Sequence, residues 1–436
     1  MDTARLLELD RALVWHPFTQ ARTAPVPVPI RSARGAVLTD ARGNEILDLV
    51  SSWWVTLHGH GRPEIARALF EQARSLEQVI FAGCTHEPAV TLCARLTRLL
   101  PPGLCRCFFS DNGSTAVEVA LKMALQERVN RGERGCRILA FDGGYHGDTV
   151  GAMSAGASSR FFEAWREWLF PVDVLPVPAT WTGDGAAEAR EAAAPERLDR
   201  HLERHGRATA AAILEPLVQG AGGMRMHRPA FLRAAAERLQ ARGVRVILDE
   251  VMTGFGRTGA LFACHEAGVA PDLICLSKGL TGGALPMALT VATEAVHQAF
   301  LAPETGKAFL HGHSFTANPL GCAAALASLD LLLDPGCARA RARIERRHRS
   351  DLAAIVAASP RAARMRVQGT IAAFDVAAPD GADLDARMQR FFLDRGLLLR
   401  PLAGTLYLLP PYCVTDAQLD LAYAGIAEGL ERGFRD

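Results

Sequence analysis

The sequence predicts an α/β fold with a mostly parallel sheet, accompanied by a smaller α+β part. Short apolar runs rich in β-branched residues recur along the 436-residue chain, and helical stretches separate them. Polar residues and glycines follow directly after several of these runs. Alternation of strands and helices at this spacing is typical of parallel sheets covered by helices.

The strands of the large sheet are expected in four short segments. The clearest is 244–251, VRVILDEV, a nearly continuous apolar run typical of a strand that is buried on both faces. The other three strand candidates are 136–141, 210–217 and 272–279. Helical periodicity predicts helices at 114–129, with Ser114 or Thr115 as the cap, and at 229–243.

The two ends of the chain differ from this alternating middle. Residues 1–60 are irregular, with a hairpin expected at 35–49, and we expect them to contribute to a small domain and to the substrate pocket. Residues 61–325 are expected to form the large α/β domain, with 175–207 as a surface excursion carrying one helix. Residues 326–436 are expected to form the small α+β domain, entered through a long helix over 320–333 and 338–358.

Composition excludes several classes of protein. With 49% hydrophobic and 22% charged residues and a net charge of +1, the chain offers no electrostatic case for binding nucleic acid or an anionic membrane. It has no run of about 20 apolar residues, and charges interrupt its first fifteen residues, so neither a membrane span nor a secretory signal is expected. The ten cysteines lack zinc-ligand spacing, so we expect no metal site and free, buried thiols in a reducing cytoplasm.

Residues with chemical potential lie at the ends of the predicted strands. Asp249 ends one strand, Lys278 follows another, and Tyr145 lies in the turn after a third. Gly113 and Ser114 open a helix, where free N–H groups and the helix dipole favour a phosphate. Amine, carboxylate, aromatic ring and anion seat together suit a phosphorylated aromatic aldehyde cofactor that is bound through a lysine.

Each of these features also has an ordinary structural explanation. Asp249 alone is more often a turn residue, Tyr145 a core residue, and the segment around Ser114 a helix cap. The glycine-rich 143–148 lacks the G-x-G-x-x-G pattern of dinucleotide-binding loops. A protein amine is scarce here, because only Lys122, Lys278 and Lys307 among the 48 basic residues are lysines. Lys122 is expected on a helix, either in packing or in contact with solvent, and Lys307 in a mobile loop.

Longer motifs around these residues resemble a known family. ILDEVMTGFGRTG, followed by PDLICLSKGLTGGALPMA, is similar to the signature of class III aminotransferases, which use pyridoxal 5′-phosphate on the fold-type I scaffold. The segments WHPFTQ, SSWW, SDNGSTAVEVALKMALQ, GGYHGDTVGAMS, EPLVQGAGGMRM and LHGHSFTANPLGCAAA resemble one branch, which transaminates 8-amino-7-oxononanoate with S-adenosylmethionine in biotin synthesis. The likeness covers 15–412, nearly the whole chain.

The resemblance implies a role for each matching position. Lys278 would form the Schiff base, Asp249 would hold the pyridine nitrogen, and Tyr145 would lie against the cofactor and touch the substrate. The implied phosphate ligands are Gly113 and Ser114, with Gly312, His313 and Ser314 reaching over from the neighbouring subunit of a homodimer with shared sites. The implied substrate residues are Phe18, Trp53, Trp54, Tyr145, Lys278, Gly312 and Arg400.

Three positions depart from the family pattern and leave alternatives open. Phe18 stands where well-known members have tyrosine, so a hydroxyl contact is lost and the amino donor is less certain. His313 stands where a proline is expected, and Met252 where many relatives have glutamine. A general ω-aminotransferase, use of lysine as donor, and a non-transferring enzyme such as an aminomutase or decarboxylase stay open, as does a cofactor-binding regulatory protein on the same fold.

Overall fold

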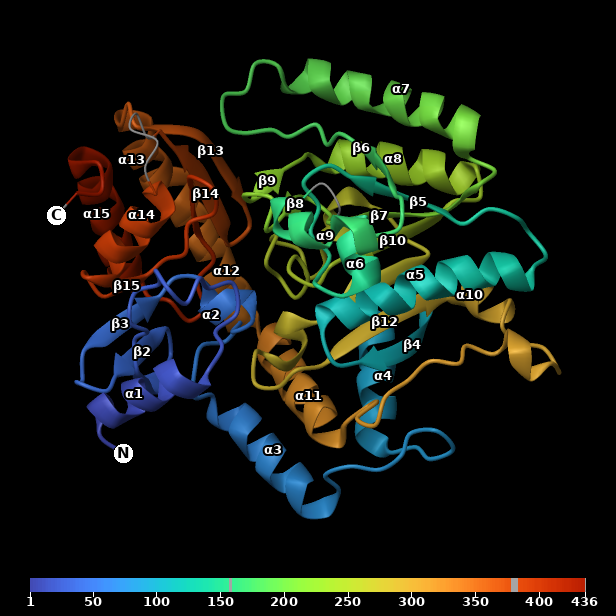
Figure 1. The fold of residues 1–436 in the computed structure, drawn as a ribbon, viewed down its shortest axis with the longest axis horizontal. Coiled ribbons are helices and arrows are strands. Elements are labelled where there is room, and N and C mark those ends of the chain that lie inside the picture. Colours follow the sequence, from blue (N-terminus) through green and yellow to red (C-terminus); the bar gives the residue numbers. More distant parts are fainter. Residues whose placement is uncertain (157–158, 378–382, 436) are drawn as a thin grey trace.

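A seven-stranded sheet forms the centre of the computed structural model, which describes residues 1–156, 159–377 and 383–435 (Figure 1). Its spatial order is β4-β12-β11-β10-β7-β5-β6. Five neighbouring strands, from β11 to β6, run parallel, whereas β12 is antiparallel to both of its neighbours. The expected mostly parallel sheet is therefore confirmed. The strands are β4 (Leu104–Ser110), β5 (Arg137–Phe141), β6 (Asp173–Leu175), β7 (Thr209–Leu214), β10 (Arg245–Asp249), β11 (Leu273–Leu276) and β12 (Ala288–Thr293).

Both faces of the sheet are covered, which explains why its strands are nearly continuous apolar runs. In β10, Ile247 faces the layer that contains helix α5 (Gly113–Asn130), whereas Val246 and Leu248 face the layer that contains α8 (Pro229–Ala241). The large part of the molecule further includes α3 (Pro63–Ser75), α4 (Glu87–Leu99), α6 (Val150–Ala155), α7 (Ala187–His205), α9 (Ala263–Ala267), α10 (Glu294–Gln298) and α11 (Pro319–Leu333), the ribbon β8 (Val218–Gln219) with β9 (Arg225–Met226), and the short helices η1 (Arg160–Trp168), η2 (Lys278–Thr281) and η3 (Thr305–Lys307).

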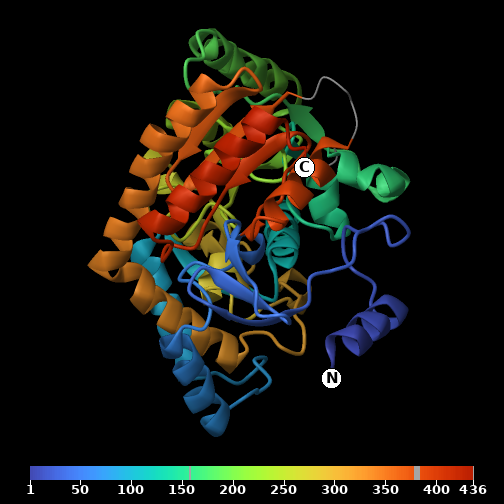
Figure 2. The same ribbon diagram turned by 90° about the vertical axis from the view of Figure 1, so that its left-hand side faces the viewer.

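The two ends of the chain meet in smaller sheets. β15 (Leu397–Leu398) pairs in parallel with β3 (Glu45–Asp48), so a C-terminal strand completes an N-terminal sheet. Figure 2 shows the blue N-terminal strands below the red and orange C-terminal elements. The other elements of this part are α1 (Thr3–Leu13), β1 (Ile30–Arg34), β2 (Val37–Asp40), α2 (Ser51–Trp54), α12 (Pro335–Arg347), η4 (His348–Leu352), α13 (Ala353–Ala358), β13 (Ala362–Gln368), β14 (Ile371–Val376), α14 (Leu384–Leu393), β16 (Thr405–Leu408) and α15 (Asp416–Arg432).

The structure corrects the sequence-based elements in three places. The first 60 residues are less irregular than expected, because α1 precedes the hairpin of β2 and β3. Asn112, not Ser114 or Thr115, is the N-cap of α5, and its side chain accepts from the N–H of Thr115. The expected long helix breaks at Asp334, which caps α12, and α11 meets the helical stretch after it at 68°.

Two further features concern the helices. Within the described ranges no single helix is long and apolar enough to span a membrane, and only the bent pair around Asp334 meets that test by length and composition. Helix α11 (Pro319–Leu333) crosses the domain boundary expected at residue 325. That boundary and the one at residue 60 stay predictions.

Candidate functional site

The carboxyl ends of the parallel strands gather the site. Asp249 is the last residue of β10, Glu215 follows β7, His146 lies in the turn after β5, and Lys278 follows β11. Ligands of open α/β sheets bind beyond this edge, because loops and helix N-termini converge there. Asp249 and Lys278 therefore lie at strand ends, as the sequence predicted.

Asp249 is held by a buried histidine. Its Oδ2 lies 2.7 Å from His146 Nδ1, and its Oδ1 accepts from the N–H of Val251 at 3.1 Å. Burial acts to lower the pKa of His146, but the hydrogen bond and the charge of Asp249 outweigh it and raise the pKa. The contact with His146 therefore fixes in place the Asp249 carboxyl group, the group that would hold a proton on a ring nitrogen.

A second buried carboxyl, that of Glu215, braces the same corner. It accepts the N–H of Tyr145 at 3.0 Å and the N–H of Gly220 at 2.9 Å. Burial raises its pKa to about 7, and the charges of His146 and Asp249 act in opposite directions on it. Glu215 thus fixes the backbone of the turn that carries Tyr145 and His146.

Lys278 combines an unusual backbone conformation with a side-chain amine that has no ion-pair partner among the described residues. Its φ is 46°, a left-handed conformation that costs a non-glycine residue free energy and often marks a functional position. Its Nζ lies 4.7 Å from the ring centroid of Trp54 and has no hydrogen-bond or ion-pair partner among the described residues. Burial lowers the pKa of Lys278, and the charges of Asp249 and Glu215 only partly oppose this. A lower pKa makes the neutral, reactive amine more available.

The start of α5 offers two free backbone donors. Asn112 and Thr115 form a capping box, which uses the N–H groups of both residues. The N–H groups of Gly113 and Ser114 have no acceptor within the described part of the chain. The Ser114 hydroxyl is engaged with Thr149, whose N–H it accepts at 2.9 Å, so the free donors are backbone groups. This arrangement suits a phosphate.

Tyr145 lies with its ring against Phe162. The two rings are stacked, with centroids 5.8 Å apart and planes 19° apart. The phenol donates to Asp148 Oδ1 at 3.0 Å, and burial raises its pKa. Tyr145 is therefore a protonated phenol, fixed at both its backbone and its hydroxyl.

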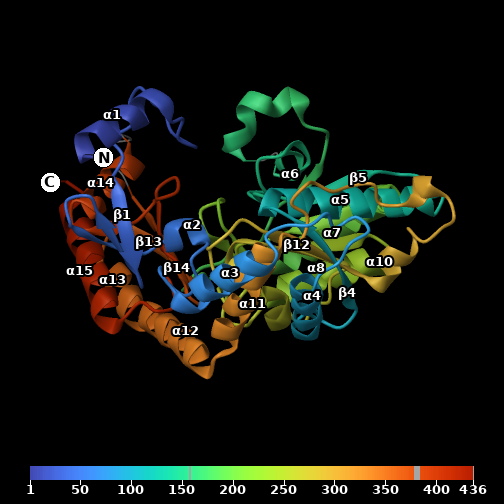
Figure 3. The same cartoon turned by 90° about the horizontal axis from the view of Figure 1, so that it is seen from below.

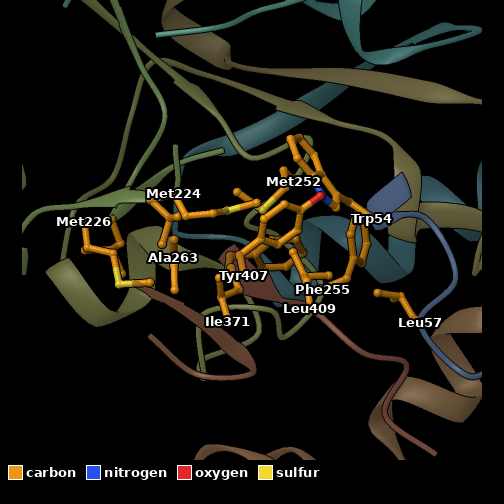
Figure 4. Close-up of a cluster of buried hydrophobic side chains, with 14 of the residues drawn as sticks. Trp54, Leu57, Met224, Met226, Met252, Phe255, Ala263, Ile371, Tyr407 and Leu409 are labelled. Atoms are coloured by element: carbon orange, nitrogen blue, oxygen red, sulfur yellow. The ribbon is translucent and has the colours of Figure 1, made fainter. Parts of the chain in front are cut away.

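The paired tryptophans occupy a strained turn. Residues 51–54 all have positive φ, with 141° at Trp53 and 70° at Trp54. Trp54 is buried and donates its indole N–H to Tyr407 at 3.0 Å, whereas Trp53 is partly exposed. Figure 4 shows Trp54 beside Tyr407 and Met252 in one apolar cluster, so the Met252 departure replaces a polar contact with core packing.

The expected substrate residues Phe18 and Arg400 meet at Trp53. Phe18 contacts its ring edge to face, 5.5 Å between centroids, and the Arg400 guanidinium lies 4.3 Å from the Trp53 centroid. Arg400 has no carboxylate partner in the described part of the chain, so its fork is available to a carboxylate of a ligand.

The segment expected to reach a partner's phosphate is exposed. Gly312, His313 and Ser314 are all exposed, and His313 Nδ1 lies 3.4 Å from Asp111 Oδ2 of the same chain. Lys122, expected on a helix in packing or in contact with solvent, contacts the residues before this segment, because its Nζ lies 2.9 Å from His311 Nδ1. Lys307 ends η3, where a loop was expected, and its carbonyl accepts from Asn130 at 2.9 Å.

Comparison with known proteins gives the family. Residues 18–430 match the model for class III aminotransferases. The chain belongs to this family. A Synechococcus elongatus protein named adenosylmethionine-8-amino-7-oxononanoate aminotransferase is 54% identical to this aminotransferase over 421 residues, 96% of this chain and 98% of that protein. The crystal structure of an enzyme of the same name from Methanocaldococcus jannaschii matches with a TM-score of 0.91 at 31% identity, covering 99% of each chain.

The cofactor of this aminotransferase is pyridoxal 5′-phosphate. An amine transaminase from an uncultivated Pseudomonas species, solved with this cofactor bound, matches with a TM-score of 0.90 at 28% identity, covering 96% of this chain and 98% of that one. The residues present fit the group: two N–H groups at the start of α5 and a lysine amine, all without a partner among the described residues, and a buried carboxyl group that contacts a histidine. No cluster of metal-binding side chains occurs within the described ranges.

Sequence reasoning missed several members of the site. His146 and Glu215 were not assigned roles, although both lie inside the motifs GGYHGD and EPLVQG. Arg257 is buried without a carboxylate partner among the described residues and donates to the carbonyl of Pro410 at 2.9 Å. Buried charged side chains are rare, and their burial marks these residues as members of the site. This burial cannot be recognised in the sequence alone.

Proposed function

We propose that the chain transfers the amino group of S-adenosylmethionine to 8-amino-7-oxononanoate and forms 7,8-diaminononanoate, a step of biotin synthesis. The observation that carries this proposal is the full-length similarity to enzymes named for that reaction, at 54% identity in one case. The site supports it, because Trp53 is flanked by the ring of Phe18 and by Arg400, which has no carboxylate partner among the described residues. An apolar chain that ends in a carboxylate, as in the acceptor, matches these two features.

The residues divide the chemistry between them. Pyridoxal phosphate, when bound, supplies an aldehyde that carries the amino group and a ring that accepts electrons. Lys278 would hold the cofactor through its side-chain amine, and the same amine would move the proton from the donor's amino-bearing carbon. Asp249, positioned by His146, would hold a proton at the ring nitrogen. The N–H groups of Gly113 and Ser114 bind the phosphate.

The remaining assignments concern the substrate and the assembly. We assign Arg400 to the substrate carboxylate, and Phe18, Trp53, Trp54 and Tyr145 to the walls of the pocket. We also propose a homodimer in which Gly312, His313 and Ser314 complete the partner's phosphate site. The exposure of this segment, with Phe315 59% exposed beside it, supports that arrangement. The ten free cysteines support a cytoplasmic setting, although only Cys264, Cys275 and Cys322 are buried, where buried thiols were expected in general.

A donor screen tests the proposed function. The purified holoenzyme receives 8-amino-7-oxononanoate with S-adenosylmethionine, lysine, alanine or 4-aminobutyrate, and formation of 7,8-diaminononanoate is measured. We expect the fastest turnover with S-adenosylmethionine. Faster turnover with lysine would show that lysine is the amino donor. Activity only with pyruvate or 2-oxoglutarate as acceptor would indicate a general ω-aminotransferase.

A further inference from the structure

Three aromatic rings from three segments meet almost at right angles beside the site. The ring of Phe161 lies 5.8 Å from that of Phe18 with planes 89° apart, and 6.4 Å from that of Tyr145 with planes 80° apart. We call Phe18, Phe161 and Tyr145 the aromatic corner. Phe161, which lies in η1, connects two residues already assigned to the substrate pocket and has no role of its own so far.

The position of Phe161 follows from the orientation of η1. The blue N-terminal segment and the green helical turn that follows α6 project from the same side of the molecule (Figure 3). Phe18 reaches this place with a φ of 50° and a ring that is 51% exposed. Tyr145 is fixed from behind by its stack on Phe162. Phe161 therefore closes the gap between an exposed ring and a fixed one.

The angles between the rings indicate what the corner can bind. A flat base prefers a ring parallel to itself, whereas a compact cation is attracted to the faces of several rings that surround it. The donor of the proposed function carries a sulfonium cation several bonds from its reacting carbon. In the acceptor, the ammonium group is next to the reacting ketone. Lys278 Nζ, which marks the reacting position, lies 4.7 Å from the ring centroid of Trp54, which is not one of the three rings of the corner.

We propose that Phe161 is a specificity-determining residue of this aminotransferase, and that the aromatic corner recognises the sulfonium cation of the amino donor. This inference rests on the proposed function. Phe161 contributes binding free energy to the donor and almost none to the acceptor. It acts on the cation and not on the adenine, so it distinguishes S-adenosylmethionine from its neutral thioether, S-adenosylhomocysteine.

The test uses the holoenzyme and variants that either remove or keep an aromatic ring. Phe161→Leu removes the ring, Phe161→Tyr restores one, and Trp168→Leu is the matched control, because Trp168 lies in the same η1 and is 75% exposed. We expect Phe161→Leu to raise the KM for S-adenosylmethionine about 3- to 30-fold, the range of a desolvated cation–π contact. The KM for the acceptor and the Kd for S-adenosylhomocysteine should change less than about twofold.

The possible outcomes separate the inference from the function on which it rests. Absence of S-adenosylmethionine turnover by the unmodified enzyme overturns both. Turnover with an unchanged KM in Phe161→Leu overturns the inference alone, as does an equal weakening of S-adenosylmethionine and S-adenosylhomocysteine, which would indicate an adenine contact. If Phe161→Leu does not fold, Phe161→Met also removes the ring and should give the same pattern.

Discussion

At the scale of single residues, the scarcity of lysine makes one substitution especially informative. Lys278→Arg keeps the positive charge but places a guanidinium, which stays protonated, where a neutral amine is needed. We expect turnover to fall by at least about 10³-fold, the upper part of the range for loss of a general base together with a nucleophile. Borohydride should then trap no covalent cofactor adduct, whereas circular dichroism should show an unchanged fold.

Lys307→Arg is the matched control for this change. The backbone carbonyl of Lys307, not its side chain, accepts the hydrogen bond from Asn130. Turnover and trapping should stay as in the unmodified enzyme. A Lys278→Arg protein that still forms a reducible adduct would show that another amine holds the cofactor.

Glu215 gives a prediction for stability against pH. Burial raises its pKa from 4.5 to about 7 in the folded chain. Between these two values the unfolded chain releases a proton that the folded chain retains, so stability falls as the pH rises and the loss is complete above the folded pKa. Glu215→Gln has no such proton. Its free energy of unfolding, relative to the unmodified protein, should therefore rise by about 2 to 3 kcal/mol between about pH 5 and about pH 8.

Urea unfolding of the apoprotein at the two pH values measures this difference. The exposed Glu203→Gln should show almost no pH-dependent change. Glu215→Gln also loses one acceptor for the N–H of Tyr145 or Gly220. This loss changes the free energy of unfolding equally at both pH values, so it cancels in the comparison. A constant offset between the two proteins would mean that Glu215 is ionised throughout.

Residues that act by chemical type were predictable, and residues that act by burial were not. Lys278 was found because only three lysines exist and a long motif surrounds one of them. The His146–Asp249 pair joins residues 103 positions apart, and nothing in local spacing shows that they meet. Phe161 belongs to the corner only because η1 turns back toward the N-terminal segment.

At the scale of elements, the start of α5 carries a prediction about cofactor affinity. A Cβ at Gly113 would lie 2.5 Å from Val251 Cγ1, so Gly113→Ala must displace the helix start or the loop after β10. Overpacking of this size costs about 1 to 3 kcal/mol, and we expect pyridoxal phosphate to bind about tenfold or more weakly. Titration of the apoprotein, followed by cofactor absorbance, measures the affinity.

Gly185→Ala is the matched control. It makes the same glycine-to-alanine change in backbone propensity without the steric clash. A Cβ at Gly185 would meet no heavy atom within 4 Å. An equal loss of affinity in both variants would show that the effect is general destabilisation. An unchanged affinity in Gly113→Ala would remove α5 from the phosphate site.

The elements themselves were predictable where one signal dominated. The apolar runs gave β5, β7, β10 and β11 to within a few residues, because burial on both faces leaves little room for polar side chains. The N-cap of α5 was misplaced by two or three residues, since Asn, Ser and Thr in SDNGST can all cap a helix. The break at Asp334 was missed, although Pro335 at the first turn of α12 is its ordinary sign.

At the scale of the whole molecule, the proposed sharing of sites predicts complementation between two inactive variants. Lys278→Ala removes the amine, and Ser314→Asp places a carboxylate where a phosphate is expected, so each protein alone should be nearly inactive. In a mixed dimer with shared sites, one site carries both defects and the other carries none. Random reassociation should therefore restore about a quarter of the activity of the unmodified dimer.

The exposed segment itself explains why this experiment is decisive. Gly312, His313 and Ser314 are exposed in the single chain, while Lys122 and Asn130 of α5 hold the residues before them. The start of α5 thus faces the phosphate site of its own chain. The side of the same helix holds the residues before the exposed segment, which would complete the phosphate site of the partner subunit. If Ser314 instead acted within its own chain, every site in the mixed dimer would carry one defect. No activity would then return on mixing, although size-exclusion chromatography would still show a dimer.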